Sequence, residues 1–116
     1  MNLDEKKTYY AIILGKLFER EDYITLLTGG YSLERLLWFL NGYIAGLSEG
    51  ATSYITFMSD FYSYIEQCTN IHISPRGLTY ELEAITNSQA DAVKEFYKLL
   101  HGYYDFLKLP IRQRKT

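Results

Sequence analysis

The stretch LLWFLNGYIAGLSEG, from Leu36 to Gly50, is the most apolar part of this chain of 116 residues, and it carries Gly42 and Gly46 four positions apart. This glycine spacing is typical of helix pairs in membranes. However, the stretch is bounded by Arg35 and ends in Glu49, and no apolar run in the chain reaches the roughly 18 residues that a spanning helix needs. We therefore interpret it as a helix of a globular bundle.

Projected at 100° per residue, this helix is apolar nearly all round, which predicts a central and buried position in the bundle. One face carries Leu33, Leu36, Leu37, Leu40, Ile44 and Leu47. Trp38, Phe39, Gly42 and Gly46 fall on the opposite side together with Arg35. We expect the two glycines to admit a neighbouring helix, which would offset their cost of about 1 kcal/mol each in helix propensity. We expect Arg35 to pair with an acid of that neighbour or to stack near Trp38.

Apolar residues recur at three- and four-residue spacing through the rest of the chain, which is the period of a helix. This pattern predicts five or six helices in one compact all-α domain covering residues 1–116, with 112–116 as a loose basic tail. The expected helices are Leu3–Phe18, Asp22–Leu27, Ser32–Leu47, Thr52–Cys68, Pro75–Ile85 and a long last helix between Ser88 and Pro110.

Several residues mark the expected helix ends. Ser32 and Ser88 are N-cap residues by type, and Gly29-Gly30 is suited to the end of the second helix. Ser74-Pro75 is a good cap and first-turn pair for the fifth helix. A strand competes with that helix, because Leu78, Tyr80 and Leu82 alternate with polar residues.

The charge of the chain is unevenly distributed along the sequence. Residues 19–105 hold twelve acids and five bases, a formal charge of −7, whereas the whole chain has a formal charge of −2. An acidic body argues against a nucleic-acid partner, whose phosphates require Lys and Arg. It permits a basic protein partner, although solubility alone also explains such a charge.

No arrangement of residues in the sequence indicates catalysis. Cys68, His72 and His101 are too few for a zinc site without carboxylates, and we interpret Cys68 as a core residue and the histidines as surface groups. TGGYS lacks the lysine of a phosphate-binding loop, and neighbouring acids without a cleft are usually a solvated face. We therefore expect no enzyme activity, no cofactor and no metal. The single cysteine favours a reducing compartment, and hence a cytoplasmic location.

Twelve tyrosines are more than a core of this size needs. Most can bury the ring at the core boundary and leave the hydroxyl in water, but tyrosine is also enriched at the centre of protein interfaces. Three acidic and tyrosine-bearing clusters are therefore candidate partner-binding sites. Their residues are Glu19, Glu21, Asp22 and Tyr23; Asp60, Tyr62, Ser63, Tyr64 and Glu66; and Tyr80, Glu81 and Glu83.

The segments SLERLLWFLNGYIAGL (residues 32–47) and EFYKLLHGYYDFL (residues 95–107) give the chain a resemblance to the helical immunity proteins of bacterial contact-dependent growth inhibition systems. The resemblance implies a one-to-one complex with a toxin nuclease, in which acidic side chains stand in for nucleic-acid phosphates. It assigns no role to any particular residue.

Two other functions remain open. The chain could be a helical adaptor that forms homo-oligomers or grips a partner helix through an apolar groove of the third helix. It could also be a bundle with an aromatic pocket for a small ligand. The expected state is a monomer or a small homo-oligomer without membrane contact.

Overall fold

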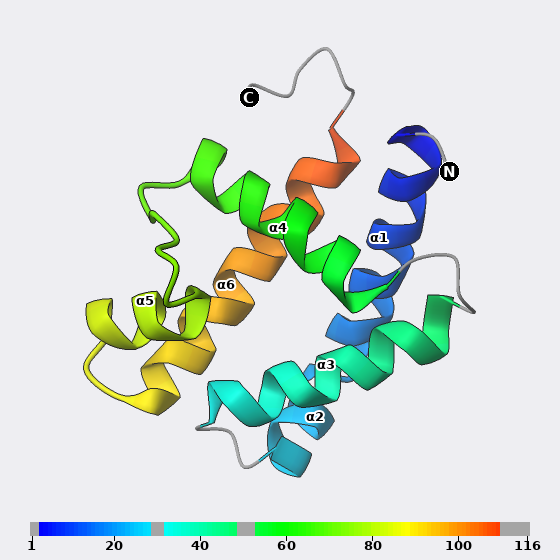
Figure 1. Cartoon of the computed structure of the whole chain (residues 1–116). Helices are drawn as coiled ribbons and strands as arrows, with labels where there is room; N and C mark the ends of the chain where they lie inside the picture. The colour runs from blue at the N-terminus through cyan, green and yellow to red at the C-terminus, as the bar shows by residue number, and fades with distance from the viewer. Residues whose placement is uncertain (1–2, 29–31, 49–52, 110–116) are drawn as a thin grey trace.

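The computed structural model describes residues 3–28, 32–48 and 53–109, which form six α-helices and contain no strand (Figure 1). The helices are α1 (Leu3–Glu19), α2 (Glu21–Thr28), α3 (Leu33–Ser48), α4 (Tyr54–Cys68), α5 (Leu78–Ile85) and α6 (Gln89–Lys108). The prediction of a compact all-α domain is confirmed. The alternating residues from Leu78 to Leu82 lie in a helix, so the strand alternative is wrong.

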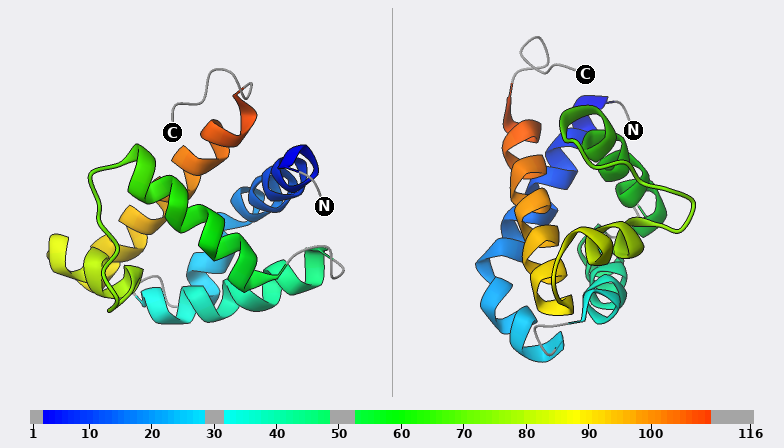
Figure 2. Two further views of the ribbon diagram at one scale, coloured as in Figure 1. Left: turned by 45° about the horizontal axis from the view of Figure 1, so that its top comes forward. Right: turned by 90° about the vertical axis from the view of Figure 1, so that its left-hand side faces the viewer.

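The six helices form two layers, with α1, α2 and α6 in one and α3, α4 and α5 in the other (Figure 2, right). Helix α6 packs against α1, α3, α4 and α5, and α3 packs against α1, α2, α4 and α6. The centre of the fold is therefore shared by α3 and α6. None of the helices in the described part of the chain is both long enough and apolar enough to cross a membrane.

The hydrophobic core takes side chains from all six helices, at the three- and four-residue spacing that the sequence predicts. The buried residues of the first four helices are Tyr10, Ile13, Leu14, Leu17, Ile24, Leu33, Leu36, Leu40, Ile44, Phe57, Met58, Phe61 and Ile65. Helices α5 and α6 add Leu78, Leu82, Ala92, Val93, Phe96, Tyr97, Leu99, Leu100, Tyr103 and Leu107. The interpretation of Cys68 as a core residue is wrong, because it lies at the surface at the end of α4. Ile55, on the same helix, is 80% exposed.

The outer face of α3 differs from the prediction. Leu33, Leu36, Leu40 and Ile44 are buried as expected, and Leu37 is half-buried. On the opposite face, Trp38 is 76% exposed, and Gly42 and Gly46 are also exposed. Among the described residues, no atom lies within 4 Å of a Cβ added at either glycine, so none of the described helices packs closely on them. Helical periodicity places residues on faces, but it does not say whether an apolar outer face is covered.

The close approach that needs a glycine is found in α6. A Cβ added at Gly102 would lie 2.7 Å from the hydroxyl oxygen of Tyr64 and 3.8 Å from the ring carbon that bears it. The Tyr64 ring is held by Phe61, Tyr103 and Phe106, whose ring centroids lie 5.0 to 6.4 Å away. The missing side chain at Gly102 therefore makes room for one tyrosine hydroxyl.

We expect Gly102→Ala to lower the free energy of unfolding by about 1 kcal/mol, because overpacking costs about 1–3 kcal/mol and better helix propensity returns about 1 kcal/mol. In a Tyr64→Phe background the clashing oxygen is absent, so the same substitution should become neutral or stabilising. Urea unfolding of the wild type, Gly102→Ala, Tyr64→Phe and the double variant measures how the effect of Gly102→Ala on the free energy of unfolding changes between the two backgrounds. Gly42→Ala is the matched control and should stabilise the fold by up to about 1 kcal/mol. Equal effects of Gly102→Ala in both backgrounds would contradict the contact.

The helix ends follow the sequence at α3 and α6 and depart from it at α5. The Ser32 hydroxyl accepts from the Arg35 N–H at 3.2 Å, and the Ser88 hydroxyl accepts from the Asp91 N–H at 3.1 Å. Helix α5 begins at Leu78, three residues later than predicted, and its N-cap is Gly77 with φ of 94°.

The predicted cap at Ser74 is wrong because Ser74 and Pro75 belong to a turn. The Gly77 N–H donates to the Ser74 carbonyl at 2.9 Å and closes this turn before the helix starts. The φ of Gly77 is one that other residues rarely adopt, so the turn depends on glycine. The predicted helix end at Gly29-Gly30 and the tail at 112–116 lie outside the described residues.

Candidate functional site

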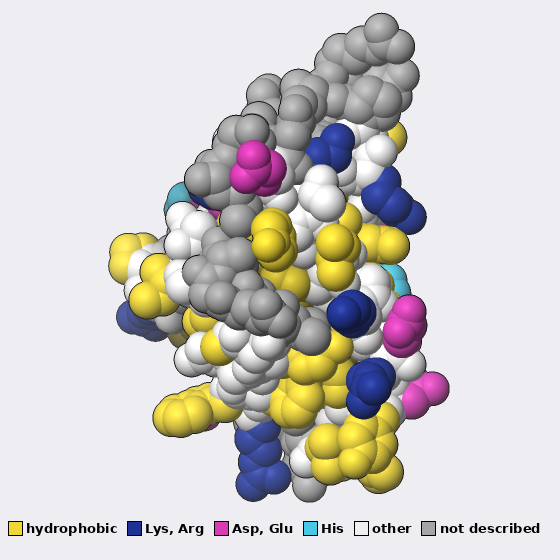
Figure 3. Space-filling model, turned by 90° about the vertical axis from the view of Figure 1, so that its right-hand side faces the viewer, with side chains coloured by type: hydrophobic (Ala, Val, Ile, Leu, Met, Phe, Trp, Pro, Cys, Tyr) yellow, Lys and Arg dark blue, Asp and Glu magenta, His cyan; other side chains and the backbone are white. Residues whose placement is uncertain are grey.

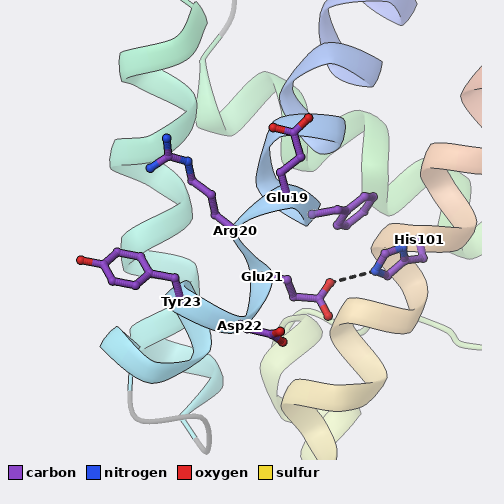
Figure 4. A pocket seen from close by; sticks show the side chains of 7 residues that line it. Glu19, Arg20, Glu21, Asp22, Tyr23 and His101 are labelled. Atoms are coloured by element: carbon purple, nitrogen blue, oxygen red, sulfur yellow. Dashed lines mark hydrogen bonds and ion pairs between the residues drawn. The ribbon is translucent and has the colours of Figure 1, made fainter.

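The first predicted cluster surrounds an open depression of about 680 Å³ at the corner between α1 and α2 (Figure 4). Its lining residues are Phe18, Glu19, Arg20, Glu21, Asp22, Tyr23 and His101. We call this site the acidic corner. It contains all four residues that the sequence singled out in this segment.

The corner arises because only Arg20 separates α1 from α2. The Arg20 N–H donates to the Leu17 carbonyl at 3.1 Å, and the Arg20 carbonyl accepts from the Ile24 N–H at 2.9 Å. One residue thus ends the first helix and starts the second. The abrupt turn gathers three carboxylates, and it places Glu21 and Asp22 in the first turn of α2, where the positive end of the helix dipole stabilises them.

Helix α6 supports the corner through His101. The His101 Nε2 lies 2.8 Å from the Glu21 Oε1, and the imidazole stacks on Phe18 with ring centroids 3.7 Å apart. Glu21 is therefore held in place, whereas Asp22 and Tyr23 are exposed. In Figure 4, Arg20 and Tyr23 extend to the opposite side of the chain from Glu21 and His101.

The second predicted cluster, on α4, is engaged in contacts within the chain. Asp60 Oδ2 accepts a hydrogen bond from the buried Tyr10 hydroxyl at 2.6 Å and lies 3.8 Å from Lys6 Nζ. The exposed Ser63 hydroxyl donates to the Ser59 carbonyl at 3.2 Å. Asp60 therefore links α4 to α1, and any role in binding would come in addition to that link.

The two tyrosines of this cluster are half-buried at the core boundary. Burial raises the pKa of the Tyr62 hydroxyl, and it is also the main cause of the raised pKa of Tyr64. At the start of the same helix, burial raises the pKa of Tyr54 to about 12. These hydroxyls stay protonated at neutral pH. The rings of the three tyrosines pack against the hydrophobic core.

Glu66 contacts the segment that follows α4 through both of its carboxylate oxygens. Its Oε1 accepts from the Ile73 N–H at 2.8 Å, and its Oε2 lies 3.2 Å from the His72 Nδ1. The Ile73 hydrogen bond, followed by the contact with His72, lowers the pKa of the Glu66 carboxyl. A backbone N–H seven residues along the chain thus holds the carboxylate in its charged form.

Because the Glu66 pKa is lower in the folded chain, the ionised carboxylate should stabilise this segment at pH values above about 4.3, the ordinary pKa of glutamate. We expect the stabilisation to disappear as the pH falls further, through the lowered pKa. Glu66→Gln keeps an oxygen acceptor but cannot ionise. Amide exchange at Ile73 should be slower in the wild type than in this variant at neutral pH, and the two should converge once the pH has fallen below the lowered pKa of Glu66. A difference that persists there would refute the assignment.

The third predicted cluster lies on α5, away from the acidic corner. Tyr80 is exposed, and the Arg76 guanidinium lies 4.8 Å from its ring centroid. Glu81 is half-buried and Glu83 is exposed. Of the three predicted clusters, the first lines this depression, and the α4 and α5 clusters do not.

Sequence reasoning did not place Phe18 and His101 in the site. Phe18 reads as an ordinary core position of α1, and His101 is 80 residues from Glu21, so no local pattern connects them. The lining of the corner becomes visible only when α6 packs on α1.

Charge is also distributed unevenly over the surface. On the face shown in Figure 3, Lys and Arg side chains lie next to exposed hydrophobic side chains, and Asp and Glu are found mainly towards the edge. Acidic side chains therefore do not dominate this face of the molecule.

Within residues 3–28, 32–48 and 53–109, no group of three or more His, Cys, Asp or Glu side chains is arranged to hold a metal ion. The chemistry of the acidic corner is that of an open, negatively charged surface with one exposed aromatic ring. Comparisons of the chain with protein-family models, with curated proteins and with solved structures find no match.

Proposed function

We propose that this chain is a non-enzymatic protein that binds and neutralises a basic protein partner, as an immunity protein neutralises a toxin nuclease. One observation carries the proposal: Glu19, Glu21 and Asp22 line one open depression, whose lining also includes the exposed Tyr23. With Arg20 counted and His101 neutral, the lining has a formal charge of −2. Such a surface complements the Lys and Arg residues with which a nuclease holds phosphates.

The geometry gives the parts of the corner different tasks in this complex. The carboxylates of Glu19 and Asp22 would steer the basic partner and raise the association rate. Tyr23 would supply a rigid aromatic contact that slows dissociation. Glu21 is already oriented by His101, so less conformational freedom is lost on binding.

A growth-rescue experiment tests the immunity function. The chain is expressed together with the C-terminal domain of any large protein encoded directly upstream of its gene, in a host that this domain kills. Wild-type chain should restore growth and should co-purify with the domain as a one-to-one complex. Killing that continues in the presence of folded chain would contradict the immunity function.

Charge reversal tests the site. Glu19 and Asp22 are both exposed, so Glu19→Lys/Asp22→Lys should leave the fold intact and slow association at least tenfold, with a weaker dependence on salt. Glu83→Lys, on α5, is the matched control and should leave the rate nearly unchanged. If Glu83→Lys slowed association more than the double reversal, the binding surface would lie on α5 and not at the acidic corner.

A further inference from the structure

The outer face of α3 has no partner within the described chain. It presents Trp38, Gly42, Ala45 and Gly46, all exposed, with Arg35 at one end. The helix lies along one edge of the molecule (Figures 1 and 2). An exposed helix face normally carries charged residues, and two glycines inside a helix weaken it. No contact within the described residues compensates for the exposed apolar side chain or for the cost of the two glycines to helix stability.

We propose that this face binds the same face of a second copy of the chain, with the two α3 helices antiparallel. The contact would be isologous, so each copy contributes the same residues and the assembly closes as a dimer. This inference does not depend on the acidic corner or on its partner.

The shape of the face is complementary to itself. Trp38 projects from the helix, and Gly42, one turn further along, leaves open space where a side chain would stand. A two-fold axis level with residue 40 places Trp38 of each copy over Gly42 of the other. The Trp38 indole rings of both copies are then buried in the interface, and the small residues let the two helices approach closely.

The charges favour the antiparallel orientation. No carboxylate among the described residues lies within 4 Å of the Arg35 guanidinium, and the last turn of α3 contains no basic residue. In the register given by the two-fold axis, Arg35 lies opposite Ala45 of the second copy. Its guanidinium then reaches the negative dipole end of that helix. A parallel pair would instead bring the two Arg35 side chains together.

The size of the face sets the expected affinity. Helix α3 has 16 residues and is therefore about 24 Å long. One face of such a helix buries less than the roughly 1,200 Å² of a standard interface, which is the range of weak and transient complexes. We expect a dimer with a dissociation constant in the micromolar range, so the protein is a monomer when dilute.

Sedimentation velocity of the full chain between about 5 and 500 µM tests the dimer. Trp38→Ala should raise the dissociation constant at least tenfold. Gly42→Gln should do the same while raising the melting temperature, because glutamine is a good helix former and fills the open space. A weaker dimer formed by a chain with a higher melting temperature separates loss of binding from loss of folding. Ile55→Ala, which removes a comparably exposed side chain from α4, should leave the dissociation constant unchanged.

Crosslinking tests the orientation. In a Cys68→Ser background, Arg35→Cys protein mixed with Ala45→Cys protein should be joined by a short bismaleimide, and Ala45→Cys protein alone should not. Efficient crosslinking of Ala45→Cys protein to itself would overturn the antiparallel arrangement. A chain that stays monomeric to about 500 µM, or a dimer weakened equally by Ile55→Ala and Trp38→Ala, would overturn the proposal.

Discussion

Replacing Phe61 by alanine is expected to lower the free energy of unfolding by about 3–5 kcal/mol, because the substitution leaves a cavity at the centre of the aromatic core. Phe61 is 0% exposed. Its ring centroid lies 5.3 Å from that of Tyr103 and 5.8 Å from that of Phe96, in contacts that join α4 to α6. The loss is comparable with the whole stability of a small domain, about 5–15 kcal/mol.

Urea unfolding followed by circular dichroism measures the effect of Phe61→Ala. Ile55→Ala is the matched control on the same helix, and it should cost less than about 0.5 kcal/mol because its side chain is exposed. Phe61→Leu should fall between the two, since leucine refills part of the cavity. A cost below about 1 kcal/mol for Phe61→Ala would show that the six helices do not close around this ring.

Replacing Asp60 by alanine is expected to cost about 2–3 kcal/mol, although Asp60 lies on the polar side of α4. Its carboxylate accepts at 2.6 Å from the hydroxyl of Tyr10, which is 2% exposed. Removing this acceptor from a buried donor costs more than a typical surface substitution, because hydrogen bonds to charged groups contribute about 1.5–3 kcal/mol. The loss should appear as a lower urea midpoint with an unchanged slope.

A double-mutant cycle isolates the Asp60–Tyr10 hydrogen bond. Tyr10→Phe removes the donor, and the combined Tyr10→Phe/Asp60→Ala protein should be more stable than the two separate losses predict, by about 1–2 kcal/mol. Additive losses would mean that the bond contributes nothing. The result also bears on binding experiments, because a reversal of Asp60 changes stability as well as charge. Glu19 and Asp22 are the cleaner positions for testing electrostatics.

The sequence predicts most of this fold because helix periodicity and burial agree. Phe57, Phe61 and Ile65 recur at four-residue spacing and are buried together. The outer face of α3 could not be predicted in the same way, because Trp38 and two glycines look identical in a sequence whether a neighbour covers them or not. The start of α5 differs from the prediction because Ser74-Pro75 fits a helix cap by type, whereas the hydrogen bond from the Gly77 N–H to the Ser74 carbonyl places both residues in a turn.

The candidate site was predictable only in part. The acids from Glu19 to Asp22 are adjacent in sequence, so any helix break near Arg20 brings them together. The support from His101 depends on α6 lying against α1, which no local pattern reveals. Glu66 shows the converse case: its place on the polar side of α4 is typical of a solvated surface acid, yet the Ile73 N–H donates to its carboxylate at 2.8 Å.

The packing of α6 on α1 has a consequence for synthesis of the chain. Lys7 Nζ donates to the Leu109 carbonyl at 2.9 Å, across 102 positions of sequence. Because α6 also contacts α3, α4 and α5, the apolar faces of the earlier helices cannot be covered until α6 has left the ribosome. We expect ribosome-bound chains that end before Gln89 to be protease-sensitive and to need chaperones, and the native fold to form only after α6 emerges.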